Sequence, residues 1–148
     1  MLIEVKVKVA RVIDGKTRKK METYVLEADV FSEAEYSVCS TLMQEQNLKT
    51  VEGFDIQSLR QSPIKEIASQ FSGDYTFIAT LKDVYLENDG TEKTMRYKVL
   101  LWANNLTEAN ANASKLIKQG YDLVIEGIKQ VDYEYLTPIT TKTDDGND

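Results

Sequence analysis

The chain has 148 residues, of which 42% are hydrophobic and 28% are charged, a composition typical of globular proteins. It contains no histidine and one cysteine, which excludes the usual zinc sites and an internal disulfide. The net charge of −6 argues against a strong nonspecific grip on duplex DNA. No apolar run approaches the ~20 residues that span a bilayer. We therefore expect a protein without cofactors, metals or membrane segments. The start of the chain lacks the pattern of a secretion signal, which indicates a cytoplasmic location.

The first half of the chain is predicted to begin with a β-hairpin. Residues 3–9 alternate apolar and charged side chains, as in a half-buried antiparallel strand. Asp14 and Gly15 tolerate the positive φ angles of a tight turn. Residues 21–28 then supply the partner strand.

A helix and a third strand should complete this half. Ser32 is a candidate N-cap with Glu35 three residues further on, the spacing of a capping box. We therefore expect a helix from Ser32 to about residue 45 and a strand over residues 53–59. Residues 63–71 begin with proline and carry apolar side chains at helical spacing, which predicts a short linker helix.

The second half repeats the first at an interval of 75 residues without a gap. The shift superposes Ile3 on Ile78, Val9 on Val84, Asp14 on Asp89, Gly15 on Gly90, Leu26 on Leu101 and Ala28 on Ala103. We therefore predict an internally duplicated α+β protein. It would consist of two ββαβ repeats related by pseudo-twofold symmetry, with antiparallel sheets each packed by a helix.

The repeat also predicts the limits of the parts. Residues 1–72 form the first repeat with its linker helix, residues 73–136 the second, and residues 137–148 a flexible acidic tail, within one compact domain overall. The second helix should be capped at Thr107, and more weakly, because Asn110 stands where a capping box has glutamate. Gly120 should end that helix and start the following strand.

The two hairpins differ on the face predicted to point away from the helix. In the first hairpin this face is mostly polar, comprising Glu4, Lys6, Lys8, Thr23, Val25 and Glu27. In the second, the 75-residue shift gives Ala79, Leu81, Asp83, Lys98, Leu100 and Trp102, with Phe77 and Tyr85 in line. An apolar face of this size needs a cover.

Several covers fit the second hairpin. Residues 63–71 or 133–136 could fold over it, or a protein partner or a second copy could bind through the Trp102 face. Single-stranded nucleic acid is the remaining alternative, with aromatic side chains stacking on bases and Arg96 and Lys98 meeting phosphates. The candidate binding residues on this hairpin are Phe77, Leu81, Tyr85, Arg96, Lys98, Leu100 and Trp102.

A dense basic cluster lies around the first turn and comprises Lys16, Arg18, Lys19 and Lys20. Charged side chains at a hairpin tip are usually only solvated. The alternative is contact with phosphate or with a partner. No catalytic signature accompanies this cluster, because the chain lacks the residues of the usual triads, zinc-water sites and phosphate-binding loops. We therefore expect no enzyme.

The segments at residues 31–35, 54–60 and 103–109 give the chain a family resemblance. It resembles a family of domains of unknown function found in Bacteroidales genomes and in associated bacteriophages and mobile elements, including crAss-like gut phages. The family has no established catalytic residues. The resemblance implies a phage or mobile-element protein that acts inside a bacterial host cell, in replication or against host defence.

Taken together, these observations predict a non-catalytic binding protein. The first hypothesis is a replication accessory that binds single-stranded nucleic acid through the basic cluster and the aromatic hairpin. The alternative is a protein-interaction or anti-defence protein, either dimeric or docking on a host or phage protein through the Trp102 face.

Overall fold

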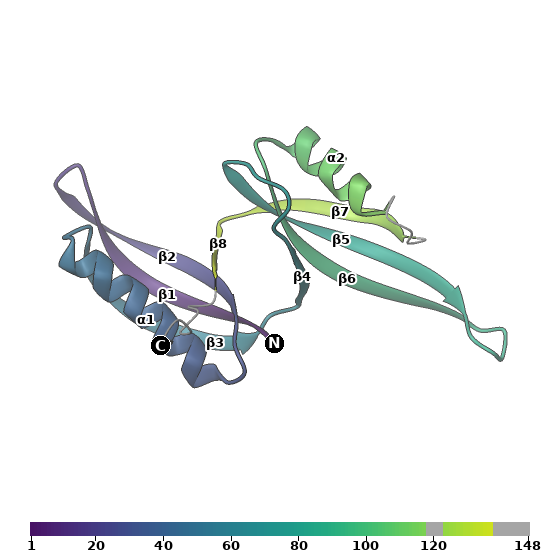
Figure 1. Cartoon of the computed structure of the whole chain (residues 1–148), viewed down its shortest axis with the longest axis horizontal. Coiled ribbons are helices and arrows are strands. Elements are labelled where there is room, and N and C mark those ends of the chain that lie inside the picture. Colours follow the sequence, from purple (N-terminus) through teal and green to yellow (C-terminus); the bar gives the residue numbers. More distant parts are fainter. Residues whose placement is uncertain (118–122, 138–148) are drawn as a thin grey trace, which may run out of the picture. The chain divides into compact units, whose positions relative to one another are not determined.

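The computed structural model describes residues 1–117 and 123–137, which fold into two compact units (Figure 1). Unit 1 comprises Met1–Ser62 together with the segment from Tyr133, and unit 2 comprises Pro63–Asp132. The sequence-based expectations for Gly120 and for residues 138–148 lie outside the described residues. The described residues of each unit form one helix and one four-stranded sheet, which confirms the predicted α+β class.

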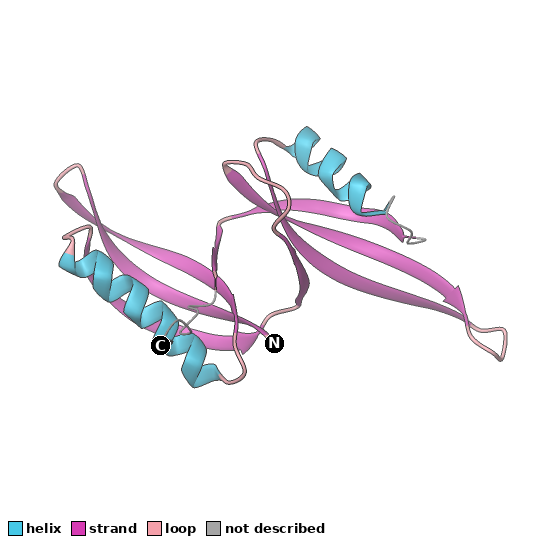
Figure 2. Cartoon of the chain, viewed as in Figure 1, coloured by secondary structure: helices cyan, strands magenta, loops and turns pink. Residues whose placement is uncertain are grey.

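In unit 1 the strands lie in the order β3-β1-β2-β8, with α1 along one face of the sheet (Figure 2). These elements are β1 (Leu2–Ile13), β2 (Lys16–Glu27), α1 (Phe31–Asn47), β3 (Val51–Gln61) and β8 (Tyr133–Leu136). The alternating residues Ile3, Val5, Val7 and Val9 are fully buried against the α1 residues Ala34, Val38 and Leu42. The period-two pattern of β1 thus forms this core, as predicted.

Unit 2 has the same topology, with the strand order β4-β6-β5-β7 and a helix on one face. Its elements are β4 (Ile64–Ala68), β5 (Tyr75–Leu86), β6 (Glu92–Ala103), α2 (Leu106–Ile117) and β7 (Leu123–Val131). Its core joins Phe77, Ala79, Leu81, Val99 and Leu101 to the α2 residues Ala109, Ala113 and Leu116. The shared topology agrees with two ββαβ-like units, and internal duplication remains a prediction.

The fourth strand of each sheet comes from the other half of the sequence. β4 follows β3 in the chain but pairs in parallel with β6, and β8 follows β7 but pairs in parallel with β2. The predicted linker helix at residues 63–71 is therefore wrong. The apolar side chains Ile64, Ile67 and Ala68 fit a pleated edge strand beside β6 instead.

The predicted role of residues 133–136 as a cover for the second hairpin is also wrong, because β8 belongs to the sheet of the first hairpin. Its Tyr135 lies opposite Val25 of β2. Val25 is fully buried, and Glu4, its neighbour on β1, is only 1% exposed. The prediction of a wet outer face in the first hairpin is therefore wrong at these two positions. β8 was not recognised as a fourth strand in the sequence.

A one-residue insertion distinguishes the two hairpins. Ile3 pairs with Leu26 in β1–β2, and the equivalent core pair in β5–β6 is Phe77 with Leu101, one residue further apart along the chain. The Asp14-Gly15 turn has two residues with positive φ angles, 52° and 76°, as predicted. The second turn instead spans the five residues between Leu86 and Glu92. The gapless 75-residue shift is therefore correct for β6 but one residue out of register for β5.

A shift of one residue moves every side chain of a strand to the opposite face. The prediction that Phe77, Ala79 and Leu81 face outward is therefore wrong. These side chains point toward α2 and lie in the core, where each is at most 1% exposed.

The helices begin earlier than predicted. α1 starts after Val30, whose side chain makes no capping hydrogen bond, so the predicted cap at Ser32 is wrong. α2 is capped by Asn105, not Thr107, since the Asn105 Oδ1 accepts a hydrogen bond of 2.8 Å from the backbone N–H of Glu108. The second helix is thus the one with a side-chain cap, the reverse of the expectation.

Candidate functional site

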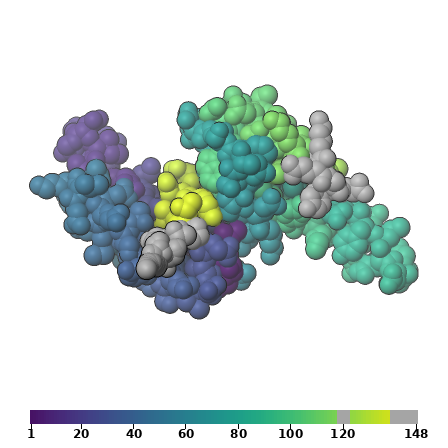
Figure 3. All heavy atoms as spheres, in the orientation of Figure 1, coloured from purple at the N-terminus to yellow at the C-terminus, as the bar shows by residue number. Residues whose placement is uncertain are grey.

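The four predicted cations Lys16, Arg18, Lys19 and Lys20 are all exposed at the β1–β2 turn. We call residues 13–20 the basic arm; they carry four cations and one anion, Asp14, a net charge of +3. Figure 3 shows these residues, in purple, projecting from the body of unit 1. The arm has only two strands at its tip, so its charges meet solvent from both faces.

The cations of the basic arm divide between the two faces of the hairpin. Lys19 pairs with Ala10 and lies on the outer face, the face of the sheet opposite the helix. Because side chains alternate along a strand, Lys16, Arg18 and Lys20 share the other face. The basic arm therefore carries three cations on one face and Lys19 alone on the outer face.

The predicted site on the second hairpin is not one surface. Phe77, Leu81 and Leu100 are at most 1% exposed, so they offer no face to a base or a partner. Leu100 lies on the outer face, opposite Ile67 of β4. Trp102 is half-buried, and its carbonyl accepts a 3.0 Å hydrogen bond from the Asn112 side chain.

Three other predicted residues of this hairpin are exposed. Tyr85 is 42% exposed near the turn, and Lys98 lies on β6. Arg96 donates hydrogen bonds of 2.8 and 2.9 Å to Glu126 of β7, so its charge is balanced locally. Of these three exposed residues, Lys98 and Tyr85 have no hydrogen-bond or ion-pair partner in the described part of the chain, and one aromatic ring does not form a stacking platform.

An ionic network that was not predicted from the sequence lies on the helix-facing side of unit 1. Arg11 donates to both Glu22 oxygens, with an Nη2–Oε1 distance of 2.7 Å, and to Glu45 of α1 at 2.8 Å. The Tyr24 hydroxyl donates to Glu22 at 2.6 Å. These contacts join β1, β2 and the C-terminal part of α1. The residues lie far apart in the sequence, and only the strand register brings them together.

The network changes the acidity of its members. Burial raises the pKa of Glu22, but the hydrogen bonds from Arg11 and Tyr24 outweigh it, so that the pKa lies below its ordinary value. The pKa of Tyr24 is raised by burial and by its hydrogen bond to the Glu22 carboxylate. The positive charge of Arg11 is therefore balanced by its carboxylate partners and does not add to the charge of the basic arm.

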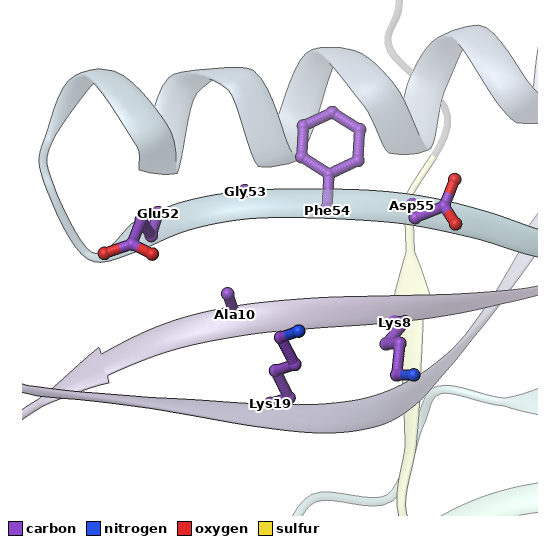
Figure 4. Close-up of a pocket in the computed structure, with 7 residues that line it drawn as sticks. All are labelled: Lys8, Ala10, Lys19, Glu52, Gly53, Phe54 and Asp55. Atoms are coloured by element: carbon purple, nitrogen blue, oxygen red, sulfur yellow. The ribbon is translucent and has the colours of Figure 1, made fainter.

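A hollow of about 430 Å³ lies on the outer face of unit 1, beside the basic arm (Figure 4). Its floor is formed where Ala10 of β1 pairs with Gly53 of β3. Both residues have little or no side chain, and a Cβ added at Gly53 would meet no atom within 4 Å. The hollow exists because two small residues face each other across adjacent strands.

Charged side chains of opposite sign line the two sides of this hollow. Lys8 and Lys19 come from β1 and β2, and Glu52 and Asp55 from β3. A Glu52 oxygen accepts a 3.1 Å hydrogen bond from Thr17, and an Asp55 oxygen accepts one of 2.9 Å from Gln57. Among the described residues, neither Lys8 nor Lys19 has a hydrogen-bond or ion-pair partner. Both ammonium groups are therefore available to a ligand.

Phe54 also borders the hollow, but its ring points toward α1 (Figure 4). It packs against the core cluster of unit 1 and is not a stacking surface. Lys8 was predicted to lie on the outer face, but the hollow itself was not predicted. The sequence signal for the hollow is a glycine in β3 that lies opposite an alanine in β1. This signal can be recognised only when the register between β3 and β1 is known.

Residues 1–117 and 123–137 contain no group of three or more His, Cys, Asp or Glu side chains that could hold a metal ion. Nor do these residues include a helix long and apolar enough to cross a membrane.

Residues 1–138 match the family described as Domain of unknown function (DUF4494), so the chain belongs to this family. No curated protein and no solved structure gives a match.

Proposed function

We propose that this is a non-catalytic binding protein that holds single-stranded nucleic acid through the basic arm. It would act as a replication accessory of a phage or mobile element in the cytoplasm of a bacterial host. The resemblance to Bacteroidales and phage sequences at residues 31–35, 54–60 and 103–109 supports this context.

The observation that carries the proposal is the exposed charge of the arm. A net charge of +3 is concentrated on residues 13–20 of a chain whose overall charge is −6. Lys16, Arg18 and Lys19 have no ion-pair partner within the described residues, whereas Arg11 and Arg96 do. Unpaired cations are the groups that bind phosphates and release counterions. Because the stacking platform is absent, contacts to the sugar-phosphate backbone would provide most of the affinity.

The test is a fluorescence anisotropy titration with a labelled oligo-dT at low salt. The triple variant Lys16→Ala/Arg18→Ala/Lys19→Ala should bind at least about tenfold more weakly than the parent. Its log–log salt slope should fall by about 2, since each phosphate contact on a single strand contributes about 0.7.

A matched variant controls for the change in net charge. Lys65→Ala/Lys93→Ala/Lys115→Ala removes three exposed cations from unit 2 and should leave binding within about twofold of the parent. Binding that is insensitive to salt, or equal weakening by the two triple variants, contradicts the proposal.

The second candidate is a protein-interaction or anti-defence function. The Trp102 face does not support it, since Leu100 is buried and Trp102 half-buried. A different observation does, because Leu86 and Met95 near the β5–β6 turn are 72% and 54% exposed, and exposed apolar side chains favour protein contacts. Association through this turn would persist at high salt, which distinguishes it from the phosphate binding proposed above.

A further inference from the structure

The hollow on the outer face of unit 1 has a chemistry that the basic arm alone does not explain. Its lining combines two unpaired ammonium groups from β1 and β2 with two carboxylates from β3 (Figure 4). A simple phosphate site would not place Glu52 and Asp55 beside the anion, because like charges repel. The arrangement fits a ligand with an anionic group and hydrogen-bond donors a few ångströms apart.

We infer that the hollow holds one nucleotide of the bound strand and selects bases that carry an amino group, namely adenine, cytosine and guanine, over thymine and uracil. This inference rests on the proposed function and adds to it a position and a base preference. Lys8 and Lys19 bind the phosphate, and Glu52 and Asp55 accept hydrogen bonds from the base.

The position of the lysines supports the first part of this inference. Lys19 belongs to both the basic arm and the wall of the hollow, so a strand held by the arm passes directly beside the hollow. Lys8 extends the positive surface along β1 on the same face. Two point charges on neighbouring strands can contact one phosphate or two successive phosphates.

The base preference follows from the chemistry of carboxylates. An ionised carboxylate only accepts hydrogen bonds. Cytosine and adenine offer an exocyclic amino group as a donor, whereas the N3–H donor of thymine lies between two carbonyl oxygens, which a carboxylate repels. The Thr17 and Gln57 contacts hold Glu52 and Asp55 in place and leave further acceptor positions on both carboxylates. The volume of about 430 Å³ lies within the usual range for small-ligand sites.

Gly53 gives a selective way to close the hollow. Its Cβ position is open and its φ angle is not positive, so Gly53→Leu should fill the hollow without a clash. Gly127→Leu is the matched control, because Gly127 lies on β7 of unit 2, opposite Thr80, and its Cβ position is equally open.

Anisotropy titrations with oligo-dC and oligo-dT at pH 7.5 test the inference. The parent should bind oligo-dC at least about tenfold more tightly, as for one hydrogen bond to a charged group. Gly53→Leu should remove this preference, and Gly127→Leu should keep it. In Glu52→Gln/Asp55→Asn the amides also donate hydrogen bonds, so the ratio of the two affinities should fall to about one.

Amide chemical shifts provide a second readout. Adding cytidine monophosphate should move the resonances of Ala10 and Gly53 in the parent more than thymidine monophosphate does, and Gly127→Leu should behave like the parent. Equal binding of oligo-dC and oligo-dT, unchanged by Gly53→Leu, overturns the inference and leaves the proposed function standing. If no oligonucleotide binds and neither nucleotide moves these resonances, both are overturned.

Discussion

Arg11 and Lys19 show how local geometry decides what a cation does. Both lie on the first hairpin, Arg11 on β1 and Lys19 on β2 near the turn, yet of the two only Arg11 is paired within the described residues. Its guanidinium binds Glu22 and Glu45 at once, whereas Lys19 points to the outer face beside Ala10. The alternation of strand residues was readable in the sequence. The partners of Arg11 were not, because they depend on the register and on the position of α1.

The Glu22 carboxylate should make the stability of unit 1 depend on pH. Its pKa is lower in the folded protein than its ordinary value of 4.5, so it contributes stability above that pH and loses the contribution as the pH falls through the folded pKa. Urea denaturation should show a loss of about 1 kcal/mol for the parent on acidification that is missing in Glu22→Gln.

The control for this effect is Glu92→Gln, which removes an exposed carboxylate on β6 and should follow the parent at every pH. An identical pH dependence in the parent and in Glu22→Gln would show that the Arg11–Glu22 contact does not stabilise the fold.

At the scale of elements, the period-two pattern predicted the long strands and the inward residues of the first hairpin correctly. It failed for β5 because the five-residue turn inserts one residue, and a one-residue error exchanges core and surface. That error led to the predicted apolar outer face that included Phe77 and Leu81. β4 was predicted as a helix because proline and apolar spacing fit both structures, and pairing with β6 decides between them.

The helix caps offer a prediction at this scale. Val30 has extended angles, φ −139° and ψ 160°, the conformation that an N-cap requires. Val30→Asn should therefore supply the bond that Asn105 makes to Glu108 in α2. We expect the free energy of unfolding to rise by about 1 kcal/mol in this variant and to fall by about 1 kcal/mol in Asn105→Ala. Urea denaturation measures both. A destabilised Val30→Asn would mean that packing of the Val30 side chain matters more than capping.

In the whole molecule, neither half of the sequence forms a complete four-stranded sheet by itself. β4, from the first half of the sequence, completes the sheet of unit 2, and β8, from the second half, completes the sheet of unit 1. Glu4 lies where the chain passes from unit 1 to unit 2. Its buried carboxylate accepts hydrogen bonds of 2.8 Å from Arg60 and from Ser62, and Ser62 is the last residue before unit 2. The sequence repeat predicted two similar units. The repeat could not reveal the exchange of strands, because β4 and β8 are too short to show a clear side-chain pattern.

The exchange predicts that removing β8 will destabilise unit 1, although β8 lies in the second half of the sequence. A chain ending at Asp132 loses the pairing of β2 residues 23–26 with β8, which includes the pair that the buried Val25 forms with Tyr135. We expect a loss of about 2 kcal/mol and faster amide hydrogen exchange in β1 and β2, with β5 and β6 less affected. A chain ending at Thr137 keeps β8 and should behave like the parent. Equal exchange rates in the two truncated chains would mean that β8 contributes nothing to the sheet. If amide hydrogen exchange became faster only in unit 2, β8 would stabilise unit 2 and not unit 1, which contradicts the prediction.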